Sequence, residues 1–154
     1  MRVYYLDASA FVKHYLAEPG SAWINEIISQ SAQDRFVSAE LVSVEVVCAI
    51  ARAEREERIS IRLRDRLAAR SLEETRTKVE LTVISRQILG HASQLALRHA
   101  LRAYDAIHLA TTLRVLNGSL LRGLPAPIFV SADTNLLAAA RAEGVTTENP
   151  NDHS

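Results

Sequence analysis

The sequence predicts an α/β fold in which a mainly parallel sheet is covered by helices on both faces. Short apolar runs rich in β-branched residues alternate along the chain with longer segments of helical periodicity, the pattern of strands connected through helices. The 154 residues are 48% hydrophobic, which fits one globular domain with a single core. We assign residues 1–147 to this domain and residues 148–154 to a C-terminal tail.

The first elements are a strand and two helices. Val3 to Leu6 is a β-branched and aromatic run, which predicts a strand. Helical periodicity from Ala10 to Ala17 ends at Glu18-Pro19-Gly20, a sequence that stops helices. Ser21 is then positioned to N-cap a second helix.

The middle of the chain contains another strand and a charged helical region. Arg35 to Ser38 predicts a second strand, and a helix follows from Glu40 to Arg55. Residues 54 to 74 are dense in mixed charge at helical spacing, which favours a largely solvated helix or helical hairpin. Residues 79 to 84 fit either a strand or the approach to a helix, and both assignments stay open here.

The last elements continue the alternation. We expect helices at residues 85–100, 104–116 and 134–143, a buried strand at 128–130 and an edge strand at 145–147. Asn117-Gly118 is expected to end the second of these helices, and Gly144 to end the third.

Four acidic residues lie beside apolar segments spread across the chain: Asp7, Glu45, Asp105 and Asp133. Carboxylates in such surroundings are costly unless something positive compensates them. Asp7 and Asp133 directly follow predicted strands, so they belong at one edge of a parallel sheet. The helical neighbours of Glu45 are apolar, so Glu45 needs a partner. Asp105 opens a helix, where an N-terminal capping role remains an alternative.

Converging carboxylates raise one another's pKa unless a hard cation lies among them. Mg²⁺ or Mn²⁺ fits this oxygen-rich set, whereas no Cys/His set has the ligand spacing of a zinc site. His108 is interpreted as a packed helix residue. Ser9 and Ser131 each lie two residues from an aspartate, where they either cap a turn or hydrogen-bond metal-bound water or substrate phosphate.

A metal held by acids alone favours hydrolytic nuclease chemistry, because it activates water and neutralises a phosphodiester without a protein nucleophile. The chain has no Gly-rich phosphate loop. Its 18 basic and 18 acidic residues exclude a global field that attracts nucleic acid. Guidance of an RNA backbone would therefore depend on local arginines, for which we consider Arg52, Arg55 and Arg102.

The single cysteine and the hydropathy pattern indicate the cellular compartment in which the protein is expected. Cys48 lies in an apolar helical run and is expected to be a small buried residue in a reducing compartment. We expect neither a signal peptide nor a membrane span, because Asp7 follows only a few apolar residues and no stretch of 18 uninterrupted apolar residues occurs. We expect a cytoplasmic protein that does not associate with membranes.

Several segments together resemble a known family. They are YLDASAFVKHY, VSAELVSVEVVCAIAR, LRAYDAIHLATTL, FVSADTNLLAAA and the ENPND tail. In their order and spacing the chain resembles the PIN-domain ribonucleases, in particular the VapC-like toxins of toxin–antitoxin pairs. The resemblance implies a three-layer α/β/α sandwich with a central twisted sheet and metal-dependent endonucleolytic cleavage of RNA. It also implies a homodimer and a VapB-like antitoxin that covers the acidic pocket.

The resemblance also assigns roles by position. Asp7, Glu45, Asp105 and Asp133 correspond to the metal-binding catalytic acids, and Ser9 and Ser131 to the small hydroxyl residues beside them. Some members have a further acid shortly after the last aspartate, where this chain has Thr134 and Asn135. Asn135 is kept as a supporting residue, and the number of metal ions, one or two, stays open.

Two other functions remain as alternatives. A haloacid-dehalogenase-like or phosphotransfer protein would use Asp7 as its nucleophile. Neither Lys13 nor Lys78 follows a later core strand, as that chemistry requires, and Ser9 replaces the second acid of the dehalogenase pattern. A non-catalytic PIN-fold binding module is the second alternative, because one fold hosts many functions.

Overall fold

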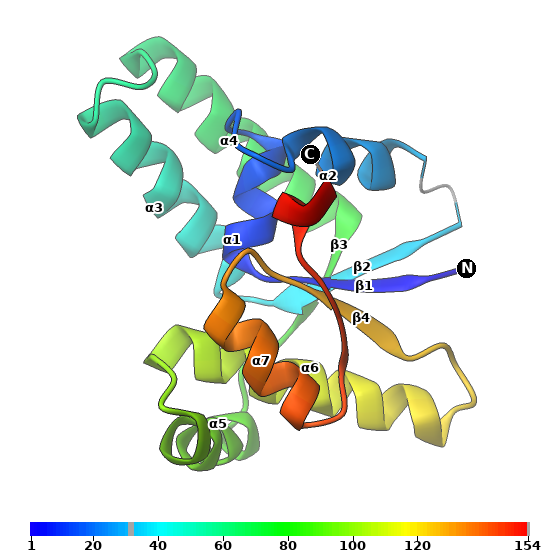
Figure 1. The fold of residues 1–154 in the computed structure, drawn as a ribbon. Coiled ribbons are helices and arrows are strands. Elements are labelled where there is room, and N and C mark those ends of the chain that lie inside the picture. Colours follow the sequence, from blue (N-terminus) through cyan, green and yellow to red (C-terminus); the bar gives the residue numbers. More distant parts are fainter. Residues whose placement is uncertain (31–32, 154) are drawn as a thin grey trace.

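A parallel sheet lies between two layers of helices in the computed structural model, which describes residues 1–30 and 33–153 (Figure 1). The five strands of the described chain are all parallel and follow the order β3-β2-β1-β4-β5. Their bounds are β1 Val3–Leu6, β2 Arg35–Ala39, β3 Val79–Thr82, β4 Pro127–Val130 and β5 Thr146–Glu148. The predicted three-layer α/β/α sandwich is confirmed.

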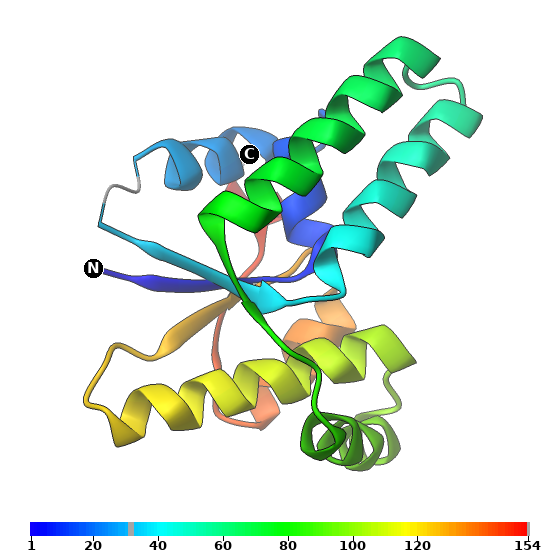
Figure 2. The same ribbon diagram turned by 180° about the vertical axis from the view of Figure 1, so that it is seen from behind.

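Each face of the sheet is covered by consecutive elements of the chain, as the two opposite views show (Figures 1 and 2). The first layer contains α1 Ala8–Phe11, η1 Val12–His14, α2 Ser21–Ser29, α3 Val42–Arg55 and α4 Ile61–Lys78. The second layer contains α5 Arg86–His99, α6 Ala103–Leu121 and α7 Thr134–Ala142. A final 3₁₀ turn, η2 Pro150–His153, lies beside α2.

The central strand β1 is buried on both faces, which explains why it is apolar throughout. Tyr4 and Leu6 belong to the core cluster under the first helical layer. Val3 and Tyr5 belong to the cluster under α5, α6 and α7. This alternation follows from the two-residue period of a strand. It also places the end of β1, where Asp7 follows, in the middle of the sheet.

The charged region at residues 54–74 is part of a helical hairpin. Helices α3 and α4 pack against each other and project beyond the sheet (Figure 2). Ser60 N-caps α4 by accepting a hydrogen bond of 3.2 Å from the Leu63 amide. Residues 79–84, which the sequence left open, begin with β3 at the edge of the sheet.

Four local predictions were wrong. The N-cap of α2 is Gly20, at φ 82°, where a Cβ would clash with the Pro150 backbone, and Ser21 is the first helical residue. The first helical segment covers residues 8–14, not 10–17. Helix α6 continues through Asn117-Gly118 to Leu121, and Ser119, beyond this pair, is still buried. Cys48 is exposed, since it lies on the side of α3 that lines the cleft with Asp7 and Glu45.

The segment assigned to a tail contributes regular structure. Glu148 is the last residue of β5, and its carbonyl accepts a hydrogen bond from the Ser131 amide. The His153 ring stacks on Trp23 with centroids 4.2 Å apart. The division of the chain at residue 147 remains a prediction. Among the described residues, no helix combines the length and apolarity needed to span a membrane.

A network centred on Glu74 joins α4 to η1. Glu74 is 14% exposed and lies 2.8 Å from Lys78 Nζ, 3.3 Å from Arg70 Nε and 3.1 Å from His14 Nε2. Burial acts to raise the pKa of Glu74, but the hydrogen bond from Lys78 and the charges of His14 and Arg70 outweigh it and hold the pKa at about 2. The ionised carboxylate therefore stabilises the folded state.

We expect Glu74→Gln to lower the free energy of unfolding at neutral pH by roughly 1–3 kcal/mol. Because the folded pKa of Glu74 lies below the unfolded value of about 4.3, this difference is complete above that value and shrinks as the pH falls towards 2. Urea unfolding at neutral and acidic pH measures it. The control is Glu73→Gln, an exposed neighbour that pairs only with Arg76 in the described structure. A difference in the free energy of unfolding that does not change with pH would contradict the stabilising role of the Glu74 carboxylate.

Candidate active site

The four predicted acids line one cleft of about 910 Å³ at the carboxyl ends of the central strands. Each comes from a different part of the fold. Asp7 follows β1, Glu45 lies in the first turn of α3, Asp105 lies in the first turn of α6, and Asp133 precedes α7. The convergence expected from sheet topology is therefore present in the structure.

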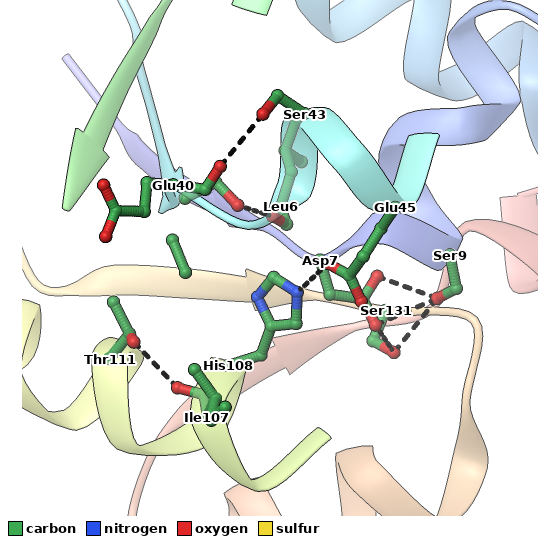
Figure 3. A network of polar contacts seen from close by, with 12 residues as sticks. Leu6, Asp7, Ser9, Glu40, Ser43, Glu45, Ile107, His108, Thr111 and Ser131 are labelled. Atoms are coloured by element: carbon green, nitrogen blue, oxygen red, sulfur yellow. Dashed lines mark hydrogen bonds and ion pairs between the residues drawn. The ribbon is translucent and has the colours of Figure 1, made fainter. Parts of the chain in front are cut away.

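Asp7 is the most enclosed of the four, with 4% of its surface exposed. It is the N-cap of α1, and its Oδ1 accepts hydrogen bonds from the Ala10 amide at 2.9 Å and from Ser9 Oγ at 2.8 Å. Its Oδ2 accepts a hydrogen bond of 2.6 Å from Ser131 Oγ (Figure 3). These contacts hold the carboxylate in a single orientation.

The charge of Asp7 is not neutralised by a salt bridge, since no lysine or arginine of the described chain pairs with it. Burial raises the pKa of the Asp7 carboxyl, while nearby His108 and the hydrogen bonds from Ser131, Ala10 and Ser9 act in the opposite direction. A buried carboxylate that receives only neutral hydrogen-bond donors is a favourable place for a cation.

Ser9 and Ser131 link two loops around Asp7. Besides its bond to Asp7, Ser9 Oγ accepts a hydrogen bond of 2.8 Å from the Ala132 amide. Ser131 Oγ likewise accepts one of 3.1 Å from the Asp133 amide. The two serines therefore tie the β1–α1 turn to the β4–α7 turn. Ser131 thus caps the turn to Asp133, as one of the two roles considered from the sequence allows, and both hydroxyls also donate to Asp7, a role that the sequence interpretation did not include.

Asp133 has a structural role that the sequence interpretation missed. It is the N-cap of α7, and its Oδ1 accepts hydrogen bonds from the amides of Asn135 at 2.9 Å and Leu136 at 3.0 Å. The signal was present, because an aspartate before an apolar helical run is a common N-cap. Asn135 contributes its backbone amide, while its side chain is exposed and does not line the cleft.

Arg102 neutralises the other two aspartates. Its guanidinium lies 3.2 Å from Asp105 Oδ2 and 3.4 Å from Asp133 Oδ2, although the arginine side chain is 84% exposed. The N-cap of α6 is Arg102, which makes no side-chain capping bond. Asp105 therefore forms an ion pair with Arg102. Its position in the first turn of α6 also allows a favourable interaction with the helix dipole, and this interaction is compatible with a role in the cleft.

Glu45 contacts a histidine that the sequence interpretation treated only as a packed helix residue. His108 Nε2 lies 2.7 Å from Glu45 Oε2, which Figure 3 shows as a contact between α6 and α3. The histidine is 2% exposed, so the prediction that it packs in the core is confirmed. Its partnership with Glu45 joins residues 63 positions apart, a pairing that local spacing does not reveal.

The donor set fits Mg²⁺ or Mn²⁺ better than zinc, because it consists of carboxylate oxygens with hydroxyl support. Asp7 provides the buried charge that lacks a cationic partner. Within the described residues, no three His, Cys, Asp or Glu side chains are gathered closely enough to form a metal-binding group. In this arrangement protein partners hold the other acids: His108 holds Glu45, and Arg102 holds Asp105 and Asp133.

The cleft also has a basic side. Lys13, Arg52 and Arg58 line it together with Glu18, and Glu18 lies 3.4 Å from Lys13 Nζ and 3.2 Å from Arg58 Nη2. Of the arginines considered from the sequence, Arg52 and Arg102 line the cleft, whereas Arg55 does not.

Comparison with known proteins agrees with this fold. Residues 4–142 match the PIN domain, and the chain belongs to the PIN-domain family. More narrowly, it is 36% identical over 148 residues to ribonuclease VapC45 of Mycobacterium tuberculosis, an alignment that covers 94% of this chain and 93% of the relative. The VapC-like membership expected from the sequence is thereby confirmed.

Solved structures share the fold at low sequence identity. Mycobacterium tuberculosis VapC20, described as a Sarcin-Ricin loop cleaving toxin, has a TM-score of 0.61 at 16% identity, covering 89% of this chain and 94% of that one. A toxin-antitoxin complex from Klebsiella pneumoniae has a TM-score of 0.55 at 14% identity, covering 96% and 97% of the two chains.

Because burial raises the pKa of Asp7, its ionised form opposes folding at neutral pH. We expect Asp7→Asn to raise the melting temperature of the metal-free protein by about 2–8 °C, since the serine hydroxyls can reorient towards an amide. The same variant should lose the rise in melting temperature that Mg²⁺ produces in the wild type. Asp65→Asn, at an exposed position of α4, is the control. A lower melting temperature for Asp7→Asn would contradict this account of Asp7.

Proposed function

We propose that the protein is a divalent-metal-dependent endoribonuclease and the toxin of a toxin–antitoxin pair. The observation that carries this proposal is the meeting of four carboxylates from separate elements in one cleft, among them a buried Asp7 without a cationic partner. The relative VapC45 is a ribonuclease, and VapC20 is a toxin that cleaves the Sarcin-Ricin loop. PIN-domain nucleases of this kind are generally metal-dependent.

A bound Mg²⁺ or Mn²⁺ would supply a water of lowered pKa and positive charge against the phosphodiester. The residues that would hold it are Asp7, Glu45, Asp105 and Asp133. Ser9 and Ser131 keep Asp7 oriented towards the cleft. Arg102 is mostly exposed and held only by surface ion pairs, so moving it away from Asp105 and Asp133 costs little free energy.

The basic side of the cleft suits the RNA backbone. Lys13, Arg52 and Arg58 border the same cleft as the acids, so a strand that presents one phosphate to the acids brings its neighbours close to these cations. Such contacts contribute affinity without base recognition. With equal numbers of acidic and basic residues in the chain, a local basic patch is needed to offset repulsion between the acids and RNA.

The hydrogen bonding of Asp7 weighs against its use as a nucleophile. Both carboxylate oxygens accept hydrogen bonds, and the residue is almost fully buried. A phospho-aspartate at Asp7 after incubation with acetyl phosphate would support the phosphotransfer alternative instead. Binding of Mn²⁺ without cleavage of any RNA would support the non-catalytic binding module.

Asp7→Asn and Asp105→Asn test the proposal directly. Each is expected to reduce Mn²⁺-dependent RNA cleavage by at least about 100-fold, because each removes a charge that the metal site needs. Cleavage of a labelled RNA with and without EDTA measures this, and the exposed Asp65→Asn variant should retain full activity. Cleavage that survives EDTA, or that both cleft variants retain, would refute the metal-site assignment.

We further propose that the cleft binds a basic C-terminal segment of a VapB-like antitoxin and that the toxin forms a homodimer. The similar fold from Klebsiella pneumoniae is part of a toxin-antitoxin complex. The position of Arg102 suggests that this segment has an arginine at its centre, because the Arg102 guanidinium lies within ion-pair distance of both Asp105 and Asp133. A second guanidinium from a partner would satisfy the same carboxylates.

If the antitoxin and the metal compete for these carboxylates, the purified complex should bind Mn²⁺ more weakly than the free toxin. We expect at least a tenfold difference, equivalent to about 1.4 kcal/mol of coupling. Titration of both samples with Mn²⁺ gives the two affinities. A complex in which the antitoxin arginine is replaced by glutamine should recover most of the free toxin's affinity. Equal affinities for free and complexed toxin would exclude shared use of the cleft.

A further inference from the structure

Glu45 lies at the end of a buried hydrogen-bond chain that begins in the sheet. The Ala39 amide, at the end of β2, donates a hydrogen bond of 3.0 Å to the Tyr5 hydroxyl. Tyr5 OH lies 3.0 Å from His108 Nδ1, and His108 Nε2 lies 2.7 Å from Glu45 Oε2. Tyr5 is fully buried and His108 is 2% exposed. The chain therefore crosses the core between two strands and two helices.

We propose that His108 is a positioning residue that holds the Glu45 carboxylate in the cleft, with its Nδ1 held by Tyr5. The proposal rests on the metal-dependent function proposed above. It adds His108 to that site, as the donor of a hydrogen bond to Glu45. His108 borders the cleft but is only 2% exposed, so it acts through Glu45 and not by touching substrate or metal.

The direction of the chain follows from the hydrogen-bonding groups. A backbone amide only donates, so the Tyr5 hydroxyl accepts from Ala39. A carboxylate only accepts, so the ring hydrogen is on Nε2, and in the neutral imidazole Nδ1 is left as an acceptor for the Tyr5 hydroxyl. Nε2–H donates to Glu45 Oε2. This assignment is inferred from the hydrogen-bond network.

The tyrosine also fixes the plane of the imidazole. The two rings are 5.8 Å apart between centroids and lie at 81° to each other, in an edge-on contact. On its other side, the Tyr5 ring packs against Phe129 of β4 at 5.5 Å. The imidazole therefore has little freedom to turn, and its Nε2–H is presented to Glu45 by the core.

Glu45 needs such support more than the other three acids. Asp7 and Asp133 have short side chains and are held by backbone amides as N-caps. Asp105 lies beside the exposed Arg102. Glu45 has a longer side chain, and its neighbours one turn away, which include the N-cap residue Leu41 and Cys48 of α3, are not strong hydrogen-bond donors. Restricting its rotamers in advance lowers the entropy lost when a metal binds.

Two substitutions of His108 separate positioning from simple core packing. In His108→Gln the amide nitrogen takes the place of Nε2, so the donor to Glu45 is kept. In His108→Asn the side chain reaches only the place of Nδ1, so contact with Tyr5 is kept and the donor to Glu45 is lost. Both remove the ring from the core, and both should therefore lower the melting temperature.

The measurement is the affinity of the metal-free full chain for Mn²⁺ by calorimetry, without RNA. His108→Asn is expected to bind Mn²⁺ about 10–100-fold more weakly than the wild type, as for loss of an outer-shell partner. His108→Gln is expected to stay within about threefold, because it keeps the donor to the ligand. Equal loss in both variants, or wild-type affinity in His108→Asn, would overturn the proposal.

Two further variants keep the test decisive if His108→Asn does not fold. Tyr5→Phe removes the hydroxyl that holds His108 Nδ1 but keeps the ring, and it should weaken Mn²⁺ binding. Thr112→Ala disturbs the same helix, since Thr112 is buried and its hydroxyl bonds to the His108 carbonyl. This control should lower the melting temperature and leave the Mn²⁺ affinity unchanged. Wild-type affinity in Tyr5→Phe, or an equal loss in Thr112→Ala, would overturn the proposal.

Failure of the proposed function gives a different result. If the wild type binds no Mn²⁺, or if Glu45→Gln binds it as tightly as the wild type does, the metal site and the positioning role are both overturned. If the wild type binds Mn²⁺ and Glu45→Gln does not, while His108→Asn binds normally, only the positioning role is overturned.

Discussion

The hydrogen bonding of the buried Asp7 carboxylate is the interaction on which the rest of the site depends. Asp7 follows the central strand, caps α1 and accepts a hydrogen bond from Ser131 in the loop after β4. Ser9 links the same two loops from the other side through the Ala132 amide. One carboxylate therefore fixes the position of both turns, and with them the distance between Asp7 and Asp133.

The four acids are stabilised in three different ways, and the differences suggest how the cleft operates. Asp7 receives neutral donors, Glu45 receives a donor from the core, and Asp105 and Asp133 share an exposed arginine. Asp7 and Glu45 are thus held rigidly, whereas the other two are paired with a side chain that can leave. The cleft therefore has one pair of acids, Asp7 and Glu45, that is preorganised, and a second pair, Asp105 and Asp133, whose arginine partner can be replaced. This combination suits the binding of a cation together with a charged substrate.

The fold places opposite charges on two sides of one cleft. The acidic side is built from the carboxyl ends of β1 and β4 and the first turns of α3 and α6. The basic side comes from η1 and from residues of the α3–α4 hairpin and the turn that follows α3. The hairpin itself projects beyond the sheet (Figure 2), and its basic residues Arg52 and Arg58 border the same cleft as the acids. An RNA strand can follow such a surface while one of its phosphates lies near the acids.

The sequence by itself determined the α/β class, the parallel sheet and the four acids, because apolar periodicity and the end of a buried strand are local properties. Tertiary structure decided the partners of those acids. The pairing of Glu45 with His108, and of Arg102 with Asp133, joins residues that are distant along the chain. The error at Cys48 has the same origin, because the cleft that leaves this residue exposed is formed by elements distant along the chain. Spacing identifies which residues are unusual, but only the packed fold brings their side chains within hydrogen-bonding distance.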